Sequence, residues 1–329
     1  MRLIFTPILA LCMFSSSASV AQTYKAAGEW KLPGSAASAV AVDSESRKVF
    51  VAGDGSITVL NADDGSTIGS IPLAGAHSLL LIPVTNGEDP APSTTGFAVA
   101  NGIAIRFGVA DLKIASEAKV TAGPSSLCYD EDGKTVEVVD PAGTLTTLDA
   151  ESGKLLKSAK VPAGAGEIAC GTLSHVYVAD TAANVVHVLN HETGRLEGDY
   201  PIMRGHKPSG LTLDTKGRRL FVACEDSAIE IIDTDSGFTF IQLEDGSGPA
   251  HGTFVWTPQG KGQWKAAAFF THADGTLSGV RMMAYINYTL GGSYKIVPGA
   301  TGIAYDSKTH HLLETTQHSG SPVVAVIGY

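Results

Sequence analysis

The sequence predicts an all-β fold: a seven-bladed β-propeller of four-stranded blades, with the ring closed by an N-terminal strand that completes the last blade. Two observations support this prediction. A unit of four short β-rich runs recurs along the 329-residue chain, and its spacing is typical of a four-stranded propeller blade. In addition, the last unit lacks one strand, while an unused strand precedes the first complete unit.

The clearest unit covers residues 209–244, "SGLTLDTKGRRLFVACEDSAIEIIDTDSGFTFIQLE". Alternating or short apolar runs bounded by turn residues predict four strands in it, at 211–213, 220–223, 229–232 and 238–243. Related units recur along the chain, and their seven starting residues are Ser38, Ser78, Ser125, Glu167, Ser209, His251 and Thr301. The intervals are 40, 47, 42, 42, 42 and 50 residues, and the two longest contain insertions at 86–96 and 257–264. Seven starts predict seven blades.

The two ends of the chain support closure of the ring. The last unit has predicted strands near 302–305, 312–316 and 323–327, and no fourth strand follows them. The segment "YKAAGEWKL" at 24–32 precedes the first complete unit. We expect it to form the outer strand of the seventh blade, which would remove two exposed sheet edges. A β-helix or a sandwich would not explain a missing last strand matched by an extra first one.

Four similar turns lie between the predicted third and fourth strands. The segment "DTDSG" at 233–237 looks like the start of a calcium loop, and its counterparts are "NADDG" (61–65), "DAESG" (149–153) and "NHETG" (190–194). Each begins with Asn or Asp, which bonds its own backbone in turns, and ends with Gly, which adopts positive φ. Calcium needs about 6–8 oxygen ligands, and Ala150 and His191 are poor ones. The sequence therefore predicts hairpin turns here.

The first 21 residues have the pattern of a signal peptide. Arg2 precedes an apolar run at 3–14, and Ser19 and Ala21 match the small residues that signal peptidase reads. We expect cleavage after Ala21, a single domain over 22–329, and a periplasmic or secreted protein. A lipid anchor on Cys12 is the alternative, which Leu11 disfavours. No other stretch approaches the roughly 20 apolar residues of a membrane helix, so we predict no membrane span.

The charge of the chain indicates which partners to expect. The formal net charge of −10 becomes −11 without Arg2, and no run of Lys or Arg occurs. The attraction that drives nonspecific nucleic-acid binding is therefore missing, and we expect no nucleic-acid partner. The expected partner is a small molecule or an envelope protein, and the expected state is a monomer.

Three cysteines remain after the predicted signal peptide: Cys128, Cys170 and Cys224. Their spacing matches neither a zinc knuckle nor a covalent haem site. Cys128 in "SSLCYD" and Cys170 in "EIACGT" occupy the same position of the first strand in neighbouring units. Equivalent positions point the same way around a ring, so we expect packing residues rather than a disulfide. Cys224 ends a predicted second strand, where it could be partly exposed.

Two of the quoted segments resemble a known family. "RRLFVACEDSAIEIIDTDSG" (218–237) and "HVYVADTAANVVHVLNHETG" (175–194) resemble the repeats of YVTN-type β-propellers, a group that includes secreted or periplasmic YncE-like proteins. The resemblance covers nearly all of the mature chain and implies the propeller fold. It implies little about function, because such propellers serve as binding modules, enzyme subunits and enzymes. The last position of the family motif reads Gly53, Asn101, Asp140, Asp180, Cys224, His272 and His318.

Candidate ligand-binding residues gather on one face of the predicted ring. Loops leading into first strands share this face with loops leaving second strands, and the hairpin turns lie on the other face. Propellers commonly bind ligands at the channel mouth, where such loops converge. We therefore predict a ligand site formed by His77, Glu167, Arg204, His206, Lys207 and His251. The histidines expected to be ordinary surface or packing residues are His175, His187, His191, His310 and His311.

A metal site is a further hypothesis for this face. His251, His272 and His318 belong to the adjacent sixth and seventh units, and neutral imidazoles suit zinc or copper, with Glu167 or an aspartate as a further ligand. Such a site requires closely converging side chains, whereas second strands stand farther from the axis than first strands. A polar ligand funnel is the preferred interpretation, and no cofactor is firmly predicted.

The sequence leaves several function classes open. No G-x-S-x-G elbow, P-loop, H-E-x-x-H or dinucleotide glycine pattern occurs. The preferred hypothesis is an exported, non-enzymatic binding or scaffold protein with its ligand at the channel mouth. The alternative is a lactonase-like or metal-dependent hydrolase that uses the same face, with Glu167, Arg204 and His206 available for catalysis. A weaker alternative is the propeller subunit of a periplasmic dehydrogenase.

Overall fold

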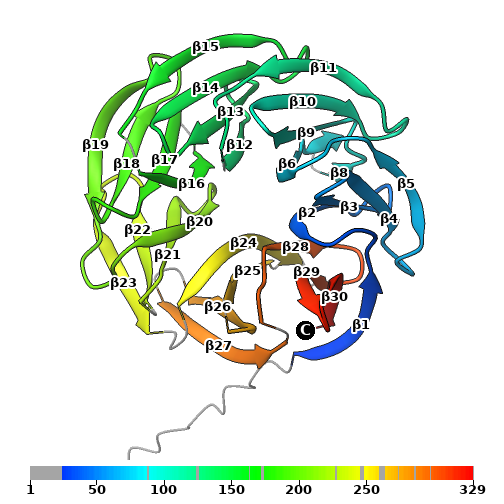
Figure 1. Cartoon of the computed structure of the whole chain (residues 1–329). Helices are drawn as coiled ribbons and strands as arrows, with labels where there is room; N and C mark the ends of the chain where they lie inside the picture. The colour runs from blue at the N-terminus through cyan, green and yellow to red at the C-terminus, as the bar shows by residue number, and fades with distance from the viewer. Residues whose placement is uncertain are drawn as a thin grey trace, which may run out of the picture.

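A computed structural model describes residues 24–86, 89–123, 126–162, 164–171, 174–226, 228–244, 248–258, 264–272, 274–284, 287–296 and 298–328. The predicted signal peptide and its cleavage site lie outside these residues, as does most of the insertion at 257–264. Seven four-stranded antiparallel sheets surround a central axis, so the prediction of a seven-bladed β-propeller is confirmed (Figure 1). The described part of the chain contains no helix that is long and apolar enough to cross a membrane.

The first four blades follow the predicted repeat, each with its first strand innermost. They are β2–β5 (Ala37–Asp43, Lys48–Gly53, Ile57–Asn61, Thr67–Ile71), β6 with β9–β11 (Ala76–Leu81, Thr95–Ala100, Ile103–Gly108, Ile114–Lys119), β12–β15 (Ser126–Asp130, Thr135–Asp140, Thr144–Asp149, Leu155–Lys160) and β16–β19 (Ala165–Cys170, His175–Asp180, Val185–Asn190, Arg195–Pro201).

The remaining blades complete the ring, and the insertion of the second blade forms a small hairpin of its own. Blades 5 and 6 are β20–β23 (Pro208–Asp214, Arg219–Cys224, Ala228–Asp233, Thr239–Glu244) and β24–β27 (Pro249–Pro258, Trp264–His272, Thr276–Ala284, Asn287–Lys295); blade 7 is β28–β30 with β1 (Gly302–Asp306, His311–His318, Ser321–Gly328, Lys25–Lys31); the hairpin is β7–β8 (Val84–Asn86, Asp89–Ala91).

The ring closes through the N-terminal strand. β1 pairs antiparallel with β30, from Lys25 opposite Gly328 to Lys31 opposite Val323. The backbone N–H of Leu32 continues the pairing by donating to the Pro322 carbonyl at 3.0 Å. In Figure 1 the strands β1 and β30 accordingly lie side by side in one blade. The prediction that the N-terminal strand supplies the missing fourth strand of the last blade is confirmed.

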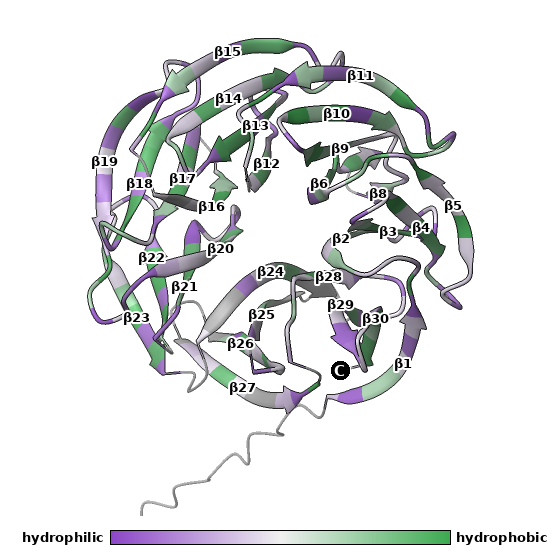
Figure 2. Ribbon diagram, in the orientation of Figure 1, coloured by the Kyte–Doolittle hydropathy of each residue, from purple (hydrophilic) through white to green (hydrophobic). Residues whose placement is uncertain are grey.

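The hydrophobic core lies in the seams between blades rather than within one blade. Each of seven clusters of buried side chains joins two neighbouring blades, as Phe50 of blade 1 and Phe107 of blade 2 illustrate. The outermost strands contribute little to these clusters; β19, for example, is mostly exposed and mainly hydrophilic (Figure 2). Burial of both faces of a blade explains the near-continuous apolar runs of the second and third strands.

The four Asn/Asp-to-Gly segments are hairpin turns, as predicted. In "DTDSG" the Asp233 Oδ1 accepts hydrogen bonds from the backbone N–H groups of Asp235 and Ser236, at 3.1 and 3.0 Å. Gly237 has a φ of 72°, a conformation that L-residues with a side chain rarely adopt. The side-chain oxygen of Asp233 therefore accepts hydrogen bonds within the turn and stabilises it.

The prediction for Cys128 and Cys170 is wrong, because the two residues form a disulfide with a Cα–Cα distance of 5.5 Å. In the sheet registers Cys128 lies opposite Glu137, whereas Cys170 lies opposite Val176. Glu137 and Val176 are not at equivalent positions of β13 and β17. The residue of β16 that is equivalent to Cys128 is Ala169, and Cys170 lies one residue further along the strand. Side chains alternate between the faces of a strand, so Cys128 and Cys170 point toward each other across the seam of blades 3 and 4.

The expectation of a partly exposed Cys224 is also wrong. Cys224 has no exposed surface, and its sulfur lies against the position that a side chain on Gly205 would occupy. Burial raises the pKa of the Cys224 thiol to about 12, with nearby Glu230 and Asp226 acting in the same direction. A thiol of that kind is protonated at neutral pH and is a poor nucleophile.

Candidate functional site

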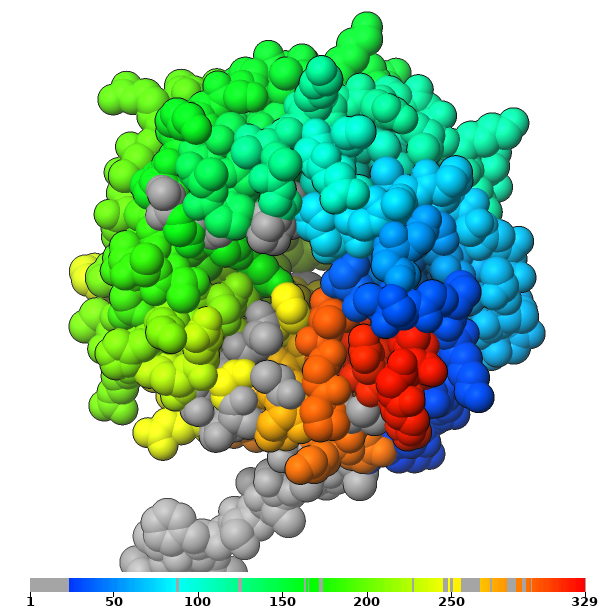
Figure 3. Space-filling view, in the orientation of Figure 1, coloured from blue at the N-terminus to red at the C-terminus, as the bar shows by residue number. Residues whose placement is uncertain are grey.

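A cavity of about 420 Å³ lies at the centre of the ring, and residues of all seven blades line it. Figure 3 shows the molecule hollowed at this point. The cavity-lining residues come mainly from the starts of the innermost strands: Ser38, Ala39, Val40, His77, Ser78, Leu79, Ser126, Leu127, Pro141, Gly166, Glu167, Ser209, His251, Gly252, Thr301, Gly302 and Ile303. Within the part of the chain that the structure describes, Glu167 is the one carboxylate of this lining, and no Lys or Arg contributes to it.

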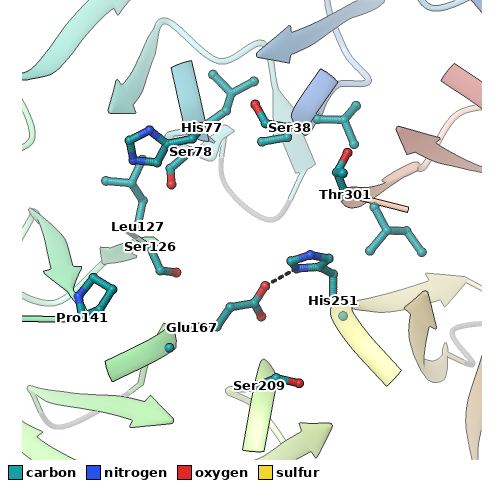
Figure 4. A pocket seen from close by; sticks show the side chains of 17 residues that line it. Ser38, His77, Ser78, Ser126, Leu127, Pro141, Glu167, Ser209, His251 and Thr301 are labelled. Carbon is teal, nitrogen blue, oxygen red and sulfur yellow. Dashed lines mark hydrogen bonds and ion pairs between the residues drawn. The ribbon is translucent and has the colours of Figure 1, made fainter. Parts of the chain in front are cut away.

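Glu167 and His251 form the main polar contact in the cavity. Glu167 is on β16 of blade 4 and His251 is on β24 of blade 6, yet Nδ1 of His251 lies 2.5 Å from Oε1 of Glu167 (Figure 4). The other carboxylate oxygen, Oε2, accepts a 2.9 Å hydrogen bond from the backbone N–H of Leu211 on β20. Glu167 therefore links three consecutive inner strands. A bulge in β16 between Ala165 and Ile168 places it at the cavity wall.

This contact changes the acid–base behaviour of His251. Burial opposes the charged imidazolium, but the negative charge of Glu167 and its hydrogen bond to the ring outweigh burial and raise the pKa of His251 above 6.5. The pair is thus either Glu⁻ with His⁺, which is neutral in sum, or Glu⁻ with a neutral His whose Nδ1–H is donated to Glu167. In both states Nε2 is the ring nitrogen that Glu167 leaves unbonded.

Hydroxyl side chains form hydrogen bonds between neighbouring inner strands around the same cavity. Ser38 on β2 donates to the Ala76 carbonyl on β6 at 2.6 Å, and Thr301, just before β28, donates to the Ala37 carbonyl on β2 at 2.8 Å. Between blades 3 and 4, the Ser126 hydroxyl accepts the Ile168 backbone N–H at 3.2 Å. The mouth of the channel is therefore held by side chain-to-backbone bonds between blades, and it presents oxygen atoms to the cavity.

The structure brings together three of the six residues predicted to bind a ligand. His77, Glu167 and His251 all line the cavity, with His77 on the wall across from His251 (Figure 4). The His77 Nδ1 lies 3.3 Å from the Gly75 carbonyl. Glu167 and His251 contact each other directly, although 84 residues separate them in sequence.

The other three predicted residues lie outside the cavity lining. His206 is largely exposed and contacts Asp226 at 2.7 Å, and Lys207 pairs with Glu225 at 3.3 Å. Arg204 is exposed as well. These residues belong to the β19–β20 loop, which leads into blade 5 but contributes none of them to the cavity lining.

Glu230 explains the course of that loop. This buried carboxylate on β22 accepts the backbone N–H groups of Met203, Arg204 and Gly205 at 3.1, 2.7 and 2.8 Å, together with the Thr239 hydroxyl at 2.8 Å. Four donors satisfy the charge and tie the loop to the body of blade 5. The predicted convergence of Arg204 with Glu167 is therefore not part of this arrangement.

The three histidines of the metal hypothesis make separate contacts. His251 bonds to Glu167; His272 is buried with Nε2 2.7 Å from the Ser278 hydroxyl; and Nδ1 of His318 lies 2.6 Å from Glu29. Among the described residues, no group of three or more His, Cys, Asp or Glu side chains is arranged to hold a metal ion. A zinc or copper site stays a prediction, which elemental analysis of metal-supplemented protein would test.

The sheet registers correct two positions of the motif column. In blade 2 the strand β9 ends at Ala100, opposite Ala76, and Asn101 follows it in the turn with a φ of 46°. In blade 7 Thr315 lies opposite Gly302, as Ala223 lies opposite Gly210 in blade 5. Thr316 is therefore the equivalent of Cys224, and His318 lies two residues further along β29. The longer β29 hairpin accounts for its contact with Glu29 on β1.

Sequence reasoning missed the hydroxyls of the cavity wall. Ser38, Ser126 and Thr301 line the cavity together with Ser78 and Ser209. All of them lie at or next to the starting positions of the repeated units, so a recurrent small hydroxyl residue at the unit start was the available signal. Comparison of the chain with known protein families and with curated proteins finds no match.

Proposed function

We propose that this chain is an exported, YncE-like propeller that acts as a non-enzymatic binding or scaffold protein and takes a ligand in the central cavity. The observation that carries the proposal is the cavity itself, to which all seven blades contribute lining residues. Its volume of about 420 Å³ falls within the range of small-molecule sites, and its lining combines polar side chains with apolar ones.

The disulfide supports the location that this proposal assumes. Cys128–Cys170 joins two blades, and disulfides persist in oxidising compartments such as the periplasm and the extracellular space. The predicted signal peptide leads to the same compartments. Two independent features thus support the proposal of a periplasmic or secreted location.

A cavity-blocking variant tests the proposed binding site. Purified mature protein is screened by thermal shift against small polar metabolites, and each compound that stabilises it is retested by calorimetry. Ser126→Trp places an indole in the cavity, whereas Ser70→Trp on the exposed outer strand β5 is the matched control. Binding that survives Ser70→Trp and is abolished by Ser126→Trp supports the proposal. Binding equally strong in both variants contradicts it.

A hydrolase is the second candidate, favoured by the Glu167–His251 contact. A carboxylate that accepts Nδ1–H leaves Nε2 of a neutral imidazole as a general base, which is the arrangement used to activate water or a hydroxyl. In such a hydrolysis Nε2 takes a proton from water, the hydroxide attacks the carbonyl carbon of an ester or lactone, and the leaving oxygen receives the proton. Turnover of small esters or lactones by the wild type and its loss in His251→Ala would establish this function and overturn the non-enzymatic one.

A further inference from the structure

We infer that the cavity recognises an uncharged polyhydroxyl compound of about the size of a mono- or disaccharide. This inference rests on the proposed binding function and names the class of ligand. Three features of the cavity wall carry it: its balance of charge, the direction of its hydrogen bonds, and its alternation of hydroxyl and apolar groups.

The balance of charge disfavours ionic ligands. Among the described residues of the lining, Glu167 is the only carboxylate and no Lys or Arg occurs. The charge of Glu167 is already met by His251 at 2.5 Å and by the Leu211 N–H at 2.9 Å. An anionic ligand would find no lasting positive charge, and a cationic ligand would have to compete with His251. Burial of a charge without a partner is unfavourable, so a neutral ligand fits best.

The hydrogen bonds of the wall hydroxyls have a fixed direction. Carbonyl oxygens only accept, so the protons of Ser38 and Thr301 are committed to the carbonyls of Ala76 and Ala37, at 2.6 and 2.8 Å. The Ser38 oxygen is therefore left as an acceptor, and Thr301, whose hydroxyl also lies 3.0 Å from that of Thr315, keeps one further lone pair as an acceptor. Carboxylate and phosphate groups are also acceptors only, and they would meet these lone pairs unfavourably. The ligand must donate hydrogen bonds on this side of the cavity.

The opposite side has a donor available. Ser126 accepts the Ile168 N–H, which leaves its hydroxyl proton to donate to a ligand. His251, on the wall beside Thr301 (Figure 4), adds Nε2, which is a donor when the ring is charged and an acceptor when it is neutral. A cavity that needs donors on one side and offers a donor on the other is complementary to hydroxyl groups, since each alcohol both donates and accepts.

Apolar groups separate the hydroxyls along the wall. Leu79, Leu127 and Ile303 line the cavity beside Ser78, Ser126 and Thr301. On blades 2, 3 and 7 the cavity wall thus presents a polar and an apolar side chain within three residues of each other. A sugar or polyol has the matching character, with C–H surfaces between its hydroxyl groups.

Calorimetry with matched sugars tests the inference. Glucose, galactose and mannose, and the disaccharides maltose and lactose, are titrated into the mature protein beside the amino sugars and uronic acids of the same hexoses. We expect at least one neutral sugar to bind, with its amino and uronic-acid forms at least about tenfold weaker, a difference well above the error of Kd. Tighter binding of a charged form, or no neutral sugar bound at concentrations up to about 10 mM, overturns the inference.

Variants assign the binding to the wall hydroxyls and separate the two proposals. Ser38→Ala and Ser126→Ala should each weaken binding of the neutral sugar about fivefold to tenfold, the effect of one hydrogen bond, while Ser70→Ala on the outer surface leaves it unchanged. Unchanged binding in both cavity variants overturns the inference. If charged compounds alone bind, and Ser126→Trp abolishes their binding, the proposed function stands and the ligand class is wrong. If no compound of any class binds, both proposals fail.

Discussion

Two seams of the ring differ in whether their buried carboxyl group has hydrogen-bond partners. In the seam between blades 3 and 4, Glu137 on β13 is buried, and its carboxylate accepts the hydroxyls of Thr135 and Thr147 at 2.9 and 2.8 Å. In the seam between blades 6 and 7, Glu314 on β29 is equally buried, but neither of its carboxyl oxygens has a hydrogen-bond partner among the described residues. Its cross-strand neighbours are Ile303 and Ala325.

The surroundings of the two carboxyl groups extend this contrast. The seam of blades 3 and 4 also contains the Cys128–Cys170 disulfide and a close contact between the buried side chains of His191 and Asp130. The seam of blades 6 and 7 instead contains aromatic packing. The ring of Phe269 lies edge-on to that of Tyr24, with ring centroids 6.4 Å apart, and stacks with that of Tyr305, with ring centroids 6.5 Å apart.

The contrast shows that burial alone does not determine what a carboxyl group contributes to stability. Burial raises the pKa of both groups. The Glu314 pKa reaches about 8, whereas the hydrogen bonds from Thr147 and Thr135 limit that of Glu137 to about 7. A buried polar group stabilises a fold when its partners are present and destabilises it when they are missing. We expect the seam of blades 3 and 4 to owe its strength to polar and covalent links, and the other seam to owe its strength to apolar packing.

Removal of the disulfide should have the largest effect on this comparison. The bond joins cysteines 42 residues apart, and the loss of a cross-link of that span is expected to lower the free energy of unfolding by about 4 kcal/mol. Denaturant titration of Cys128→Ala/Cys170→Ala measures the change. Reduced wild type should show the same loss, and the double variant should not respond to the reductant. A variant as stable as the wild type would refute the idea that the disulfide stabilises the seam of blades 3 and 4.

Glu314→Met should stabilise the protein, by about 2 kcal/mol near neutral pH, because it replaces an unpartnered buried carboxyl with an apolar side chain of similar size. The wild type should also lose stability as pH rises. The folded pKa of about 8 lies above the ordinary 4.5, so the folded state retains a proton that the unfolded chain loses. The contribution of neutral Glu314 is complete below about pH 4.5 and is lost as pH rises through about 8.

Denaturant titrations at several pH values measure both effects of Glu314→Met. The gain in stability over the wild type should grow between about pH 5 and pH 9. A constant difference, or a loss of stability, would show that Glu314 has partners that compensate its burial.

Glu137→Met should have the opposite sign, although the substitution is the same. It leaves the hydroxyls of Thr135 and Thr147 without their acceptor in the seam of blades 3 and 4, which should cost about 1–2 kcal/mol. The measurement is best made at about pH 6, where the carboxyl is mostly protonated in the folded state. A stabilising result would mean that the two seams do not differ in the way described above.

The smallest effect concerns the Glu167–His251 pair, which lies between the two seams. NMR titration of the mature protein should give His251 a pKa above 6.5, since Glu167 outweighs the effect of burial. In Glu167→Gln the charge is lost and burial acts alone, so the pKa should fall below that of the wild type. His206, which contacts Asp226 on the exposed rim, serves as an internal control that the substitution should leave unchanged.

Part of the candidate site could be predicted from the sequence, and the limit has a physical cause. His77, Glu167 and His251 precede or begin predicted first strands, and the repeat places all such positions around one channel. Arg204 and His206 have the same sequence context, yet they lie outside the cavity lining, in a loop whose backbone N–H groups at 203–205 donate to the buried Glu230. Those bonds depend on a buried residue in another strand, which no local pattern indicates.

The sequence by itself determined the number of blades, the closure of the ring by β1, and the hairpin turns. These features depend on periodicity and on local hydrogen bonding, and both are visible along the chain. The tertiary structure decided which side chains meet. A one-residue difference in register between β12 and β16 turns Cys128 and Cys170 toward each other, and the ring brings Glu167 to His251 across an intervening blade. A shift of one residue exchanges the two faces of a strand, so contacts between blades follow from register and ring geometry.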